Sequence, residues 1–195
     1  MDIMIRSSER GIAMILALFM VLVLSVVGSS LMFVSQTETL SSHNYRTTSQ
    51  ARYAAESGVH KTANYLLYTY AAPGTVADPL AAYDTTVSPV RYNGSDVVLS
   101  SNPTVVSNYP VEVVRDAFGA ATRGTLDLNN GSATYNSRAT LMSMRQIVDA
   151  YSGSPVTIQT WDITADGDIA GARSAQVEVS AVVEQEVMPM FRYAA

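Results

Sequence analysis

Three carboxylates that lie close together in the C-terminal part of the chain are the first candidates for chemistry. Asp162, Asp166 and Asp168 surround an Asp-Gly pair. Calcium takes oxygen ligands from acidic loops of this kind, but the full spacing of an EF-hand loop is missing. Asp-Gly is also the usual composition of a tight hairpin turn. We therefore favour a turn at Asp166-Gly167 over a calcium site, and we predict no metal site.

No catalytic constellation accompanies these carboxylates. His43 and His60 lie far apart in the sequence without metal-ligand spacing, and Glu56 has no evident base or nucleophile partner. The chain has no cysteine, which excludes disulfides and thiolate metal sites. The sequence therefore predicts a protein that is not an enzyme and needs no cofactor.

The charge of the chain argues against nucleic acid as a partner. The 195 residues carry a formal net charge of −5, and Lys61 is the only lysine. A nucleic-acid-binding surface needs a basic patch, and the arginines after Arg52 are scattered singly. The length fits a membrane segment plus one modest domain.

An apolar run after Gly11 is the most informative segment of the chain. No charged residue occurs from Gly11 to Thr37, and residues 12–34 read IAMILALFMVLVLSVVGSSLMFV. About 20 apolar residues suffice for a helix across a bilayer. A cleaved signal peptide has a shorter apolar core that ends at small residues, whereas here Leu31 to Val34 follow Gly28-Ser29-Ser30. We therefore predict a retained transmembrane helix, with Arg6 and Arg10 marking its cytoplasmic end.

Helical sequence continues well beyond this run. No proline occurs before Pro73, and apolar or small residues recur at spacings of three and four between residues 51 and 70. The residues that share this face are Ala51, Ala55, Gly58 or Val59, Ala63, Leu66 and Tyr70. We predict one helix over residues 12–70, about 88 Å long if unbroken, with Gly28-Ser29-Ser30 as its weak point. Pro73-Gly74 ends it.

The remainder of the chain has the pattern of β-structure. Residues 71–95 are predicted as a loop with a turn at Asn93-Gly94. Strands are predicted at residues 97–99 and 111–114. A first hairpin is predicted to join residues 124–128 with 132–136 through a turn at Asn129-Asn130-Gly131. A second hairpin is predicted to join residues 157–164 with 176–187. Residues 138–150 fit a strand or a short helix, and their place between two hairpins favours the strand. Residues 190–195 are either a final strand or the cut edge of a longer protein.

The N-terminal third of the chain resembles a known family. Ser8-Glu9-Arg10-Gly11 resembles the end of the leader in PilX-like minor pilins, a branch of the type IV pilin and pseudopilin superfamily. Tyr53-Ala54-Ala55-Glu56-Ser57-Gly58-Val59 resembles the alanine-rich segment that follows their membrane span. The resemblance covers residues 7–67 and is carried by the order and spacing of these pieces, while the rest matches only in general layout.

The resemblance implies that a prepilin peptidase cleaves between Gly11 and Ile12 and that Ile12 is then N-methylated. Glycine suits such a site, because it has no side chain to obstruct close approach to the backbone. The alternative is that Gly11 is merely a flexible residue at a membrane boundary.

The chain departs from the family at one position. Most pilins have a glutamate as the fifth residue of the mature chain, where it is thought to pair with the terminal amine of a neighbouring subunit, and here that residue is Leu16. A buried amine without a partner is costly. Leu16 therefore favours a subunit at the filament tip, where no subunit lies above it; the alternative is that this subfamily tolerates leucine anywhere.

These observations predict an α+β, pilin-like fold, in which the second half of a long N-terminal helix packs on an antiparallel β-sheet. The expected segments are a leader (1–11), a transmembrane and filament-core half-helix (12–34), an amphipathic half-helix (35–70) and a β-rich head (71–195). Contacts between subunits are expected at Leu16, Ala55, Glu56 and Gly58.

The function expected from the resemblance is that of a minor pilin in the tip or priming complex of a type IV pilus or pseudopilus. Its expected partners are other minor and major pilins, the prepilin peptidase, the inner-membrane assembly platform and membrane lipid. The expected location is a single pass through the cytoplasmic (inner) membrane with a periplasmic head, and the pilus after assembly. The alternative is a permanently membrane-anchored periplasmic binding or sensor domain.

The two functions differ in the N-terminus of the native protein. We expect intact-mass spectrometry to show a chain that begins at methylated Ile12. A chain that keeps Met1, under conditions in which the major pilin of the cell is processed, would favour the anchored domain.

Overall fold

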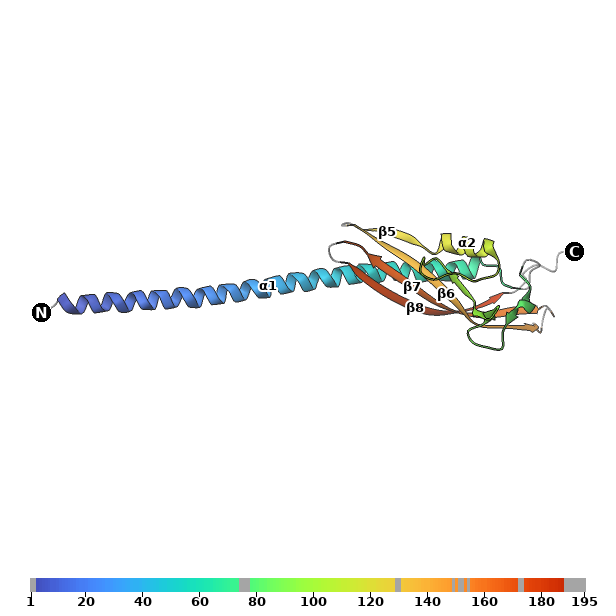
Figure 1. Cartoon of the computed structure of the whole chain (residues 1–195), viewed down its shortest axis with the longest axis horizontal. Helices are drawn as coiled ribbons and strands as arrows, with labels where there is room; N and C mark the ends of the chain where they lie inside the picture. Colours follow the sequence, from blue (N-terminus) through green and yellow to red (C-terminus); the bar gives the residue numbers. More distant parts are fainter. Residues whose placement is uncertain are drawn as a thin grey trace. The chain divides into compact units, whose positions relative to one another are not determined.

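The computed structural model describes residues 3–73, 78–128, 131–148, 150, 153, 155–171 and 174–187, with the backbone alone for residues 3–10. The chain divides into two compact units, Met1–Arg46 and Thr47–Ala195. The helix α1 (Ile3–Tyr68) contributes to both units (Figure 1). It begins before the predicted start at Ile12, so the helix passes through Gly11.

The first unit consists of α1 alone, and its sequence explains why the helix is continuous. It lacks proline, and the helix is unbroken at Gly28-Ser29-Ser30. Two of its hydroxyl groups are satisfied locally: Ser25 Oγ donates to the Val21 carbonyl at 2.7 Å and Ser29 Oγ to the Ser25 carbonyl at 2.8 Å. Such bonds to the preceding turn let serine occupy an apolar helix without an unsatisfied polar group.

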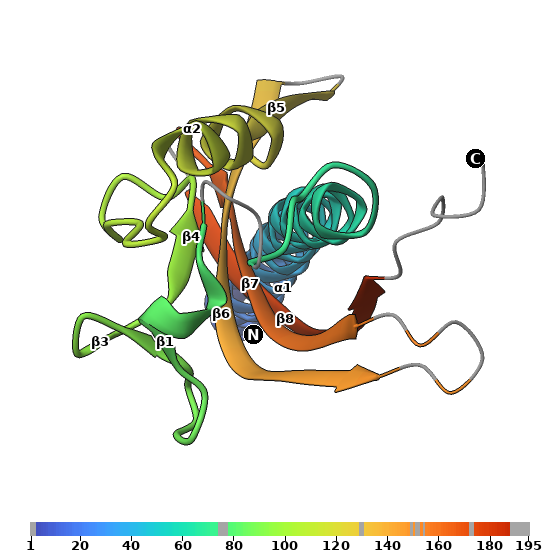
Figure 2. The ribbon, with the colours of Figure 1, turned by 90° about the vertical axis from the view of Figure 1, so that its right-hand side faces the viewer.

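The second unit is the head, in which the remainder of α1 packs on a five-stranded antiparallel sheet (Figure 2). The sheet order is β4-β6-β7-β8, and β5 also pairs with β6. The strands are β4 (Val98–Ser100), β5 (Gly124–Leu128), β6 (Gly131–Val148), β7 (Pro155–Ile169) and β8 (Ala175–Val187). The predicted α+β fold is therefore confirmed.

The core lies between α1 and one face of this sheet. Alternate residues of β7, among them Trp161, Ile163 and Ala165, are fully buried, while their neighbours in sequence face the other side. This alternation is the period of two expected of a strand with one face covered. From α1, Ala51, Ala54, Ala55 and Leu66 are fully buried.

Small residues bring the helix and the sheet unusually close. A Cβ atom placed on Gly167 of β7 would lie 2.5 Å from the backbone nitrogen of Ala55 and would overlap the carbonyl oxygen of Ala51. On the helix side, a Cβ atom on Gly58 would lie 2.8 Å from both Ala165 Cβ and Ser137 Oγ. No side chain fits at either glycine without a shift of the backbone or its neighbours.

This contact corrects the predicted turn at Asp166-Gly167. Strand β7 continues through both residues, which pair with Asn136 and Tyr135 of β6, and the connection to β8 follows Ile169. The hairpin itself is confirmed, because β7 and β8 pair from Thr157–Val187 to Ile169–Ala175. Gly167 allows the close approach of α1 to the strand and does not form a turn. The Asp-Gly pair in the sequence is compatible with either role.

The strand predicted at residues 111–114 is wrong, because this segment begins the helix α2 (Glu112–Ala121). Val113 is exposed, whereas Phe118 is fully buried and Val114 lies against the core. The buried side follows the helical spacing of three to four residues. That period becomes visible only over the whole segment, since four residues of Val-Glu-Val-Val fit either period.

The predicted loop at residues 71–95 contains more structure than expected. It holds a short 3-10 helix (Leu80–Ala82) and strands β1 (Tyr83–Asp84) and β2 (Arg91–Tyr92), and β3 (Ser95–Asp96) completes a small antiparallel sheet. The predicted turn at Asn93-Gly94 is confirmed: both residues have positive φ, 50° and 80°. Positive φ at both central positions of a two-residue hairpin explains the Asn-Gly pair.

The other β predictions are confirmed where the structure describes them. Residues 98–99 lie in β4, β5 pairs with the start of β6, and residues 138–148 form the strand that was favoured over a helix. The turn residues Asn129 and Asn130, the helix-ending Gly74 and the predicted end at 190–195 lie outside the described residues.

The glycine at position 167 gives a test of the close approach. We expect Gly167→Ala to lower the free energy of unfolding by about 1–3 kcal/mol or more, because an added methyl overpacks the helix–sheet contact. Thermal unfolding of the full chain in detergent micelles measures this. Gly119→Ala in α2 is the matched control, since its nearest neighbour would be the Ser100 carbonyl oxygen at 3.8 Å. Equal stability of both variants would contradict the proposed constraint.

Candidate functional site

The apolar residues of the first unit form an exposed surface on all sides of α1. Large side chains from Ile12 to Val34 are 42–71% exposed, including Leu16 at 63% and Phe33 at 70%. An 18-residue window of this helix has a mean hydropathy of 2.8 and no buried residue, so by length and composition it can cross a membrane. A helix that is apolar all round needs a nonpolar environment, which lipid or other helices provide.

Two predicted processing residues lie at the start of this surface. Gly11 is exposed, and a Cβ atom placed on it would meet no heavy atom within 4 Å. Ile12 is 62% exposed. The backbone between them is thus open to another protein, although its cleavage stays a prediction.

The predicted subunit-packing residues fall into two groups. Ala55 is fully buried and Gly58 is covered by Tyr135, Ser137 and Ala165, so both pack within their own chain. Glu56 accepts a hydrogen bond from Arg52 Nε at 2.8 Å, and its side chain is 35% exposed. Of the four residues, only Leu16 and Glu56 retain surface for another subunit, and that role stays a prediction for both.

The three carboxylates of β7 do not form a site. Asp162, Asp166 and Asp168 lie on the face of the sheet opposite α1, and Asp166 Oδ2 accepts a hydrogen bond from Asn102 Nδ2 at 2.8 Å. Burial and the neighbouring charge of Asp166 raise the pKa of Asp168. Within the described residues, no three His, Asp or Glu side chains are placed to hold a metal ion.

A buried tyrosine cluster, which we did not predict, lies just after the end of α1. Asp78 is only 3% exposed, and its carboxylate accepts hydrogen bonds from Tyr109 OH at 2.6 Å and from Tyr83 OH at 2.8 and 2.9 Å. Tyr70 OH lies 3.0 Å from Tyr109 OH. Because a buried carboxylate is costly unless its oxygens are paired, these hydroxyl groups stabilise it.

The same cluster connects the helix to the sheet. Gln159 of β7 donates from Nε2 to Tyr70 OH at 3.4 Å, and Trp161 Nε1 donates to Gln159 Oε1 at 3.2 Å. The ring of Tyr70 meets those of Tyr109 and Trp161 edge to face, with centroids 5.8 and 5.5 Å apart. Such pairs add stability beyond the area that they bury. Segments far apart in sequence are thereby fixed at one point.

From their place near the end of the predicted helix, Tyr65, Tyr68 and Tyr70 are expected to pack the helix against the sheet. Tyr65 and Tyr70 are buried as expected, but Tyr68 is 83% exposed. Tyr65 instead reaches α2: its ring stands edge to face with Phe118 at 5.4 Å, and its hydroxyl donates to the Val114 carbonyl at 3.2 Å. The sequence could not show that Asp78 accepts hydrogen bonds from Tyr83 and Tyr109, because these residues are brought together only by the fold.

The fold is pilin-like: its long N-terminal helix, apolar at first and then packed on an antiparallel sheet, resembles the layout of type IV pilins. Residues 10–60 match the family model described as PilX N-terminal, which confirms the resemblance over this segment. The match contains Gly11, Ile12 and Leu16 and ends within α1. It suggests a minor pilin of type IV pili, which is a structural rather than enzymatic protein associated with other pilins and with a membrane.

The comparisons with curated proteins and with solved structures found no match.

The tyrosine cluster predicts a stability defect. We expect Tyr109→Phe to lower the free energy of unfolding by about 1–3 kcal/mol, because Asp78 loses a donor and the hydroxyl of Tyr70 loses a partner. Tyr68→Phe is the control, since an exposed hydroxyl contributes within about 0.5 kcal/mol. Chemical unfolding of the full chain in detergent measures both, and equal effects would contradict the role of the cluster.

The pH dependence of the same variant is a second readout. Burial is the largest cause that raises the pKa of Tyr70, Tyr83 and Tyr109. The folded chain therefore keeps protons that the unfolded chain releases above the ordinary tyrosine pKa of about 10. The contribution of these protonated tyrosines to the free energy of unfolding is fully present below that pH and is lost as the pH rises above it. Tyr109→Phe, which has one such group fewer, should lose less stability over this range.

Proposed function

We propose that this protein is a minor pilin that acts in the tip or priming complex of a type IV pilus or pseudopilus. Before assembly, α1 anchors the subunit in the cytoplasmic membrane with the head on the periplasmic side. The assembly platform then moves the subunit into the filament, where α1 packs among the helices of other minor and major pilins. The protein contributes structure rather than catalysis.

The chemistry of α1 supports a helix that serves both environments. Its exposed apolar side chains are compatible with lipid and with packed neighbouring helices. Ala13, Ala17, Gly28 and Ser29 are small enough to allow close approach of another helix. The hydroxyl groups of Ser25 and Ser29 form hydrogen bonds within the helix. Neither position therefore carries an unsatisfied hydroxyl when the helix moves between lipid and a bundle of helices.

Cleavage by the prepilin peptidase would place a charged amine at Ile12. A methylated amine keeps its positive charge and, inside a bundle of apolar helices, needs a carboxylate partner. No Asp or Glu occurs from Gly11 to Thr37, so this chain offers no such partner within its own apolar run.

Leu16 is the observation that carries the proposal. It occupies the fifth position of the processed chain, its side chain is exposed, and it is uncharged. A subunit with leucine there leaves the amine of the subunit above it unpaired, and a buried unpaired charge is strongly destabilising. The position without this penalty is the one with no subunit above.

Substitution of Leu16 by glutamate tests the position in the filament. We expect the labelled wild-type subunit at filament tips, and we expect Leu16→Glu to appear along the shaft as well, because the new carboxylate can neutralise the next amine. Immunogold labelling of sheared filaments locates both. Leu16→Met, which keeps the position apolar, is the control and should stay at the tip. Wild-type subunits spread along the shaft would refute a tip position.

A further inference from the structure

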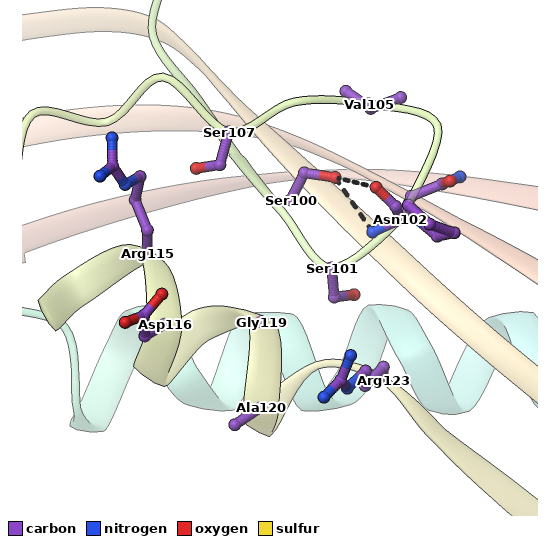
Figure 3. Close-up of a pocket in the computed structure, with 11 residues that line it drawn as sticks. Ser100, Ser101, Asn102, Val105, Ser107, Arg115, Asp116, Gly119, Ala120 and Arg123 are labelled. Atoms are coloured by element: carbon purple, nitrogen blue, oxygen red, sulfur yellow. Dashed lines mark hydrogen bonds between the residues drawn. The ribbon is translucent and has the colours of Figure 1, made fainter. Parts of the chain in front are cut away.

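A polar cleft lies in the head between α2 and the segment that follows β4 (Figure 3). Its volume is about 580 Å³. One wall is formed by residues 100–107, and the other by the side of α2 that carries Arg115, Asp116 and Gly119 together with Arg123 just beyond the helix. The volume falls within the range of sites for small organic ligands.

Hydrogen bonds fix the wall formed by residues 100–107. Asn102 is held at both ends of its amide: Nδ2 donates to Asp166 at 2.8 Å, and Oδ1 accepts from the backbone nitrogen of Thr104 at 2.9 Å. Ser101 Oγ donates to the Ser137 carbonyl at 3.1 Å, and Ser107 Oγ donates to the Val98 carbonyl at 2.9 Å. This wall is therefore formed before any ligand arrives.

The helical wall is fixed from the opposite side. Phe118 is fully buried against the ring of Tyr65, and the Thr122 carbonyl accepts a hydrogen bond from Ser137 Oγ at 3.1 Å. Both walls are thus attached to β6 or α1. A ligand that enters the cleft does not have to order its walls, which lowers the cost of binding.

Two arginines provide the charge of the cleft. Arg115 is half-buried and Arg123 exposed, and neither belongs to an ion pair among the described residues. Figure 3 shows the two guanidinium groups at opposite ends of the cleft, with the Asp116 carboxylate near the base of the Arg115 side chain. Because the two guanidinium groups lie at opposite ends of the cleft, the arginines suit two separate acidic groups rather than one small anion.

Gly119 is a second, independent sign of a binding site. It lies inside α2, where glycine weakens a helix relative to alanine. The fold does not require it, because a Cβ atom would meet nothing closer than the Ser100 carbonyl oxygen at 3.8 Å. The missing side chain instead leaves space in the cleft. A residue that opposes its own helix without a packing reason is expected at functional sites.

The lining indicates the kind of ligand. Ser100, Ser101, Ser107 and Asn102 line the cleft together with the two arginines, and the apolar lining residues are Val105, Pro103 and Ala120. A peptide that binds as an added strand uses pockets for its alternate side chains, whereas a hydroxylated ligand matches this polar lining. Planar guanidinium groups pair with carboxylates through two parallel hydrogen bonds.

We propose that this cleft binds an acidic oligosaccharide, with Arg115 and Arg123 each pairing with one acidic group and the serine-rich wall contacting hydroxyl groups between them. Asp116 lies near the base of the Arg115 side chain and disfavours a more highly charged anion at that end. The site is independent of the position of the subunit in a filament, so it does not depend on the role of Leu16.

Calorimetric titration of the full chain in detergent micelles with tri-galacturonate tests the proposal. We expect binding that weakens with added salt, because the pairs are partly exposed. We expect Arg115→Gln and Arg123→Gln each to weaken it about tenfold, and Gly119→Leu to abolish it by filling the cleft. Arg145→Gln is the matched control, since Arg145 is an exposed arginine of β6 that does not line the cleft.

Three comparisons decide the result. Unchanged thermal unfolding of Gly119→Leu establishes that its lost binding is due to the filled cleft. Neutral maltotriose should not bind, and equal binding of the neutral and acidic sugars would overturn the role of the arginines. No binding of tri-galacturonate by the wild type, equal loss in Arg145→Gln, or tighter binding of a short peptide with two glutamates would each overturn the proposal.

Discussion

The close contact between α1 and β7 is the constraint on which the rest of the head depends. Gly167 lies directly against the backbone at Ala51 and Ala55, and Gly58 lies against Ala165. At such short separations the side chains that fill a normal helix–sheet interface have no room. The alanine-rich segment of α1 is therefore a packing surface for the sheet of its own chain, and the large buried side chains lie farther along, towards Tyr70 and Trp161.

One helix thus carries two surfaces with opposite requirements. Residues 12–34 expose large apolar side chains, which only lipid or other helices can cover. Residues 51–66 bury small side chains against the head. The buried cluster of Tyr70, Asp78 and Tyr109 then holds the chain where it leaves the helix. These two surfaces are separated along the sequence of the helix, so the packing of the head does not involve the exposed apolar residues.

Patterns that repeat over many residues were predicted correctly, whereas patterns of a few residues succeeded at the Asn93-Gly94 turn and failed at Val111 to Val114 and at Asp166-Gly167. The long apolar run and the helical face at Ala51 to Tyr70 each extend over several periods, so an error at one position does not alter the assignment. The segment Val111 to Val114 and the pair Asp166-Gly167 are too short to contain several periods of a helix or a strand. Their structure depends on Phe118 and on the backbone of Ala51, which lie outside the window that the prediction used.

The sequence by itself determined the apolar helix, the Gly11-Ile12 junction and the uncharged Leu16, because these are properties of residue type along one continuous helix. The family match over residues 10–60 depends on the same local information. The tertiary structure alone decided that Ala55 and Gly58 are buried within the chain, that Asp78 accepts hydrogen bonds from Tyr83 and Tyr109, and that Arg115 and Arg123 line a cleft with residues 100–107. Each of these joins segments distant in sequence, and their approach depends on how the helix and strands pack rather than on any local pattern.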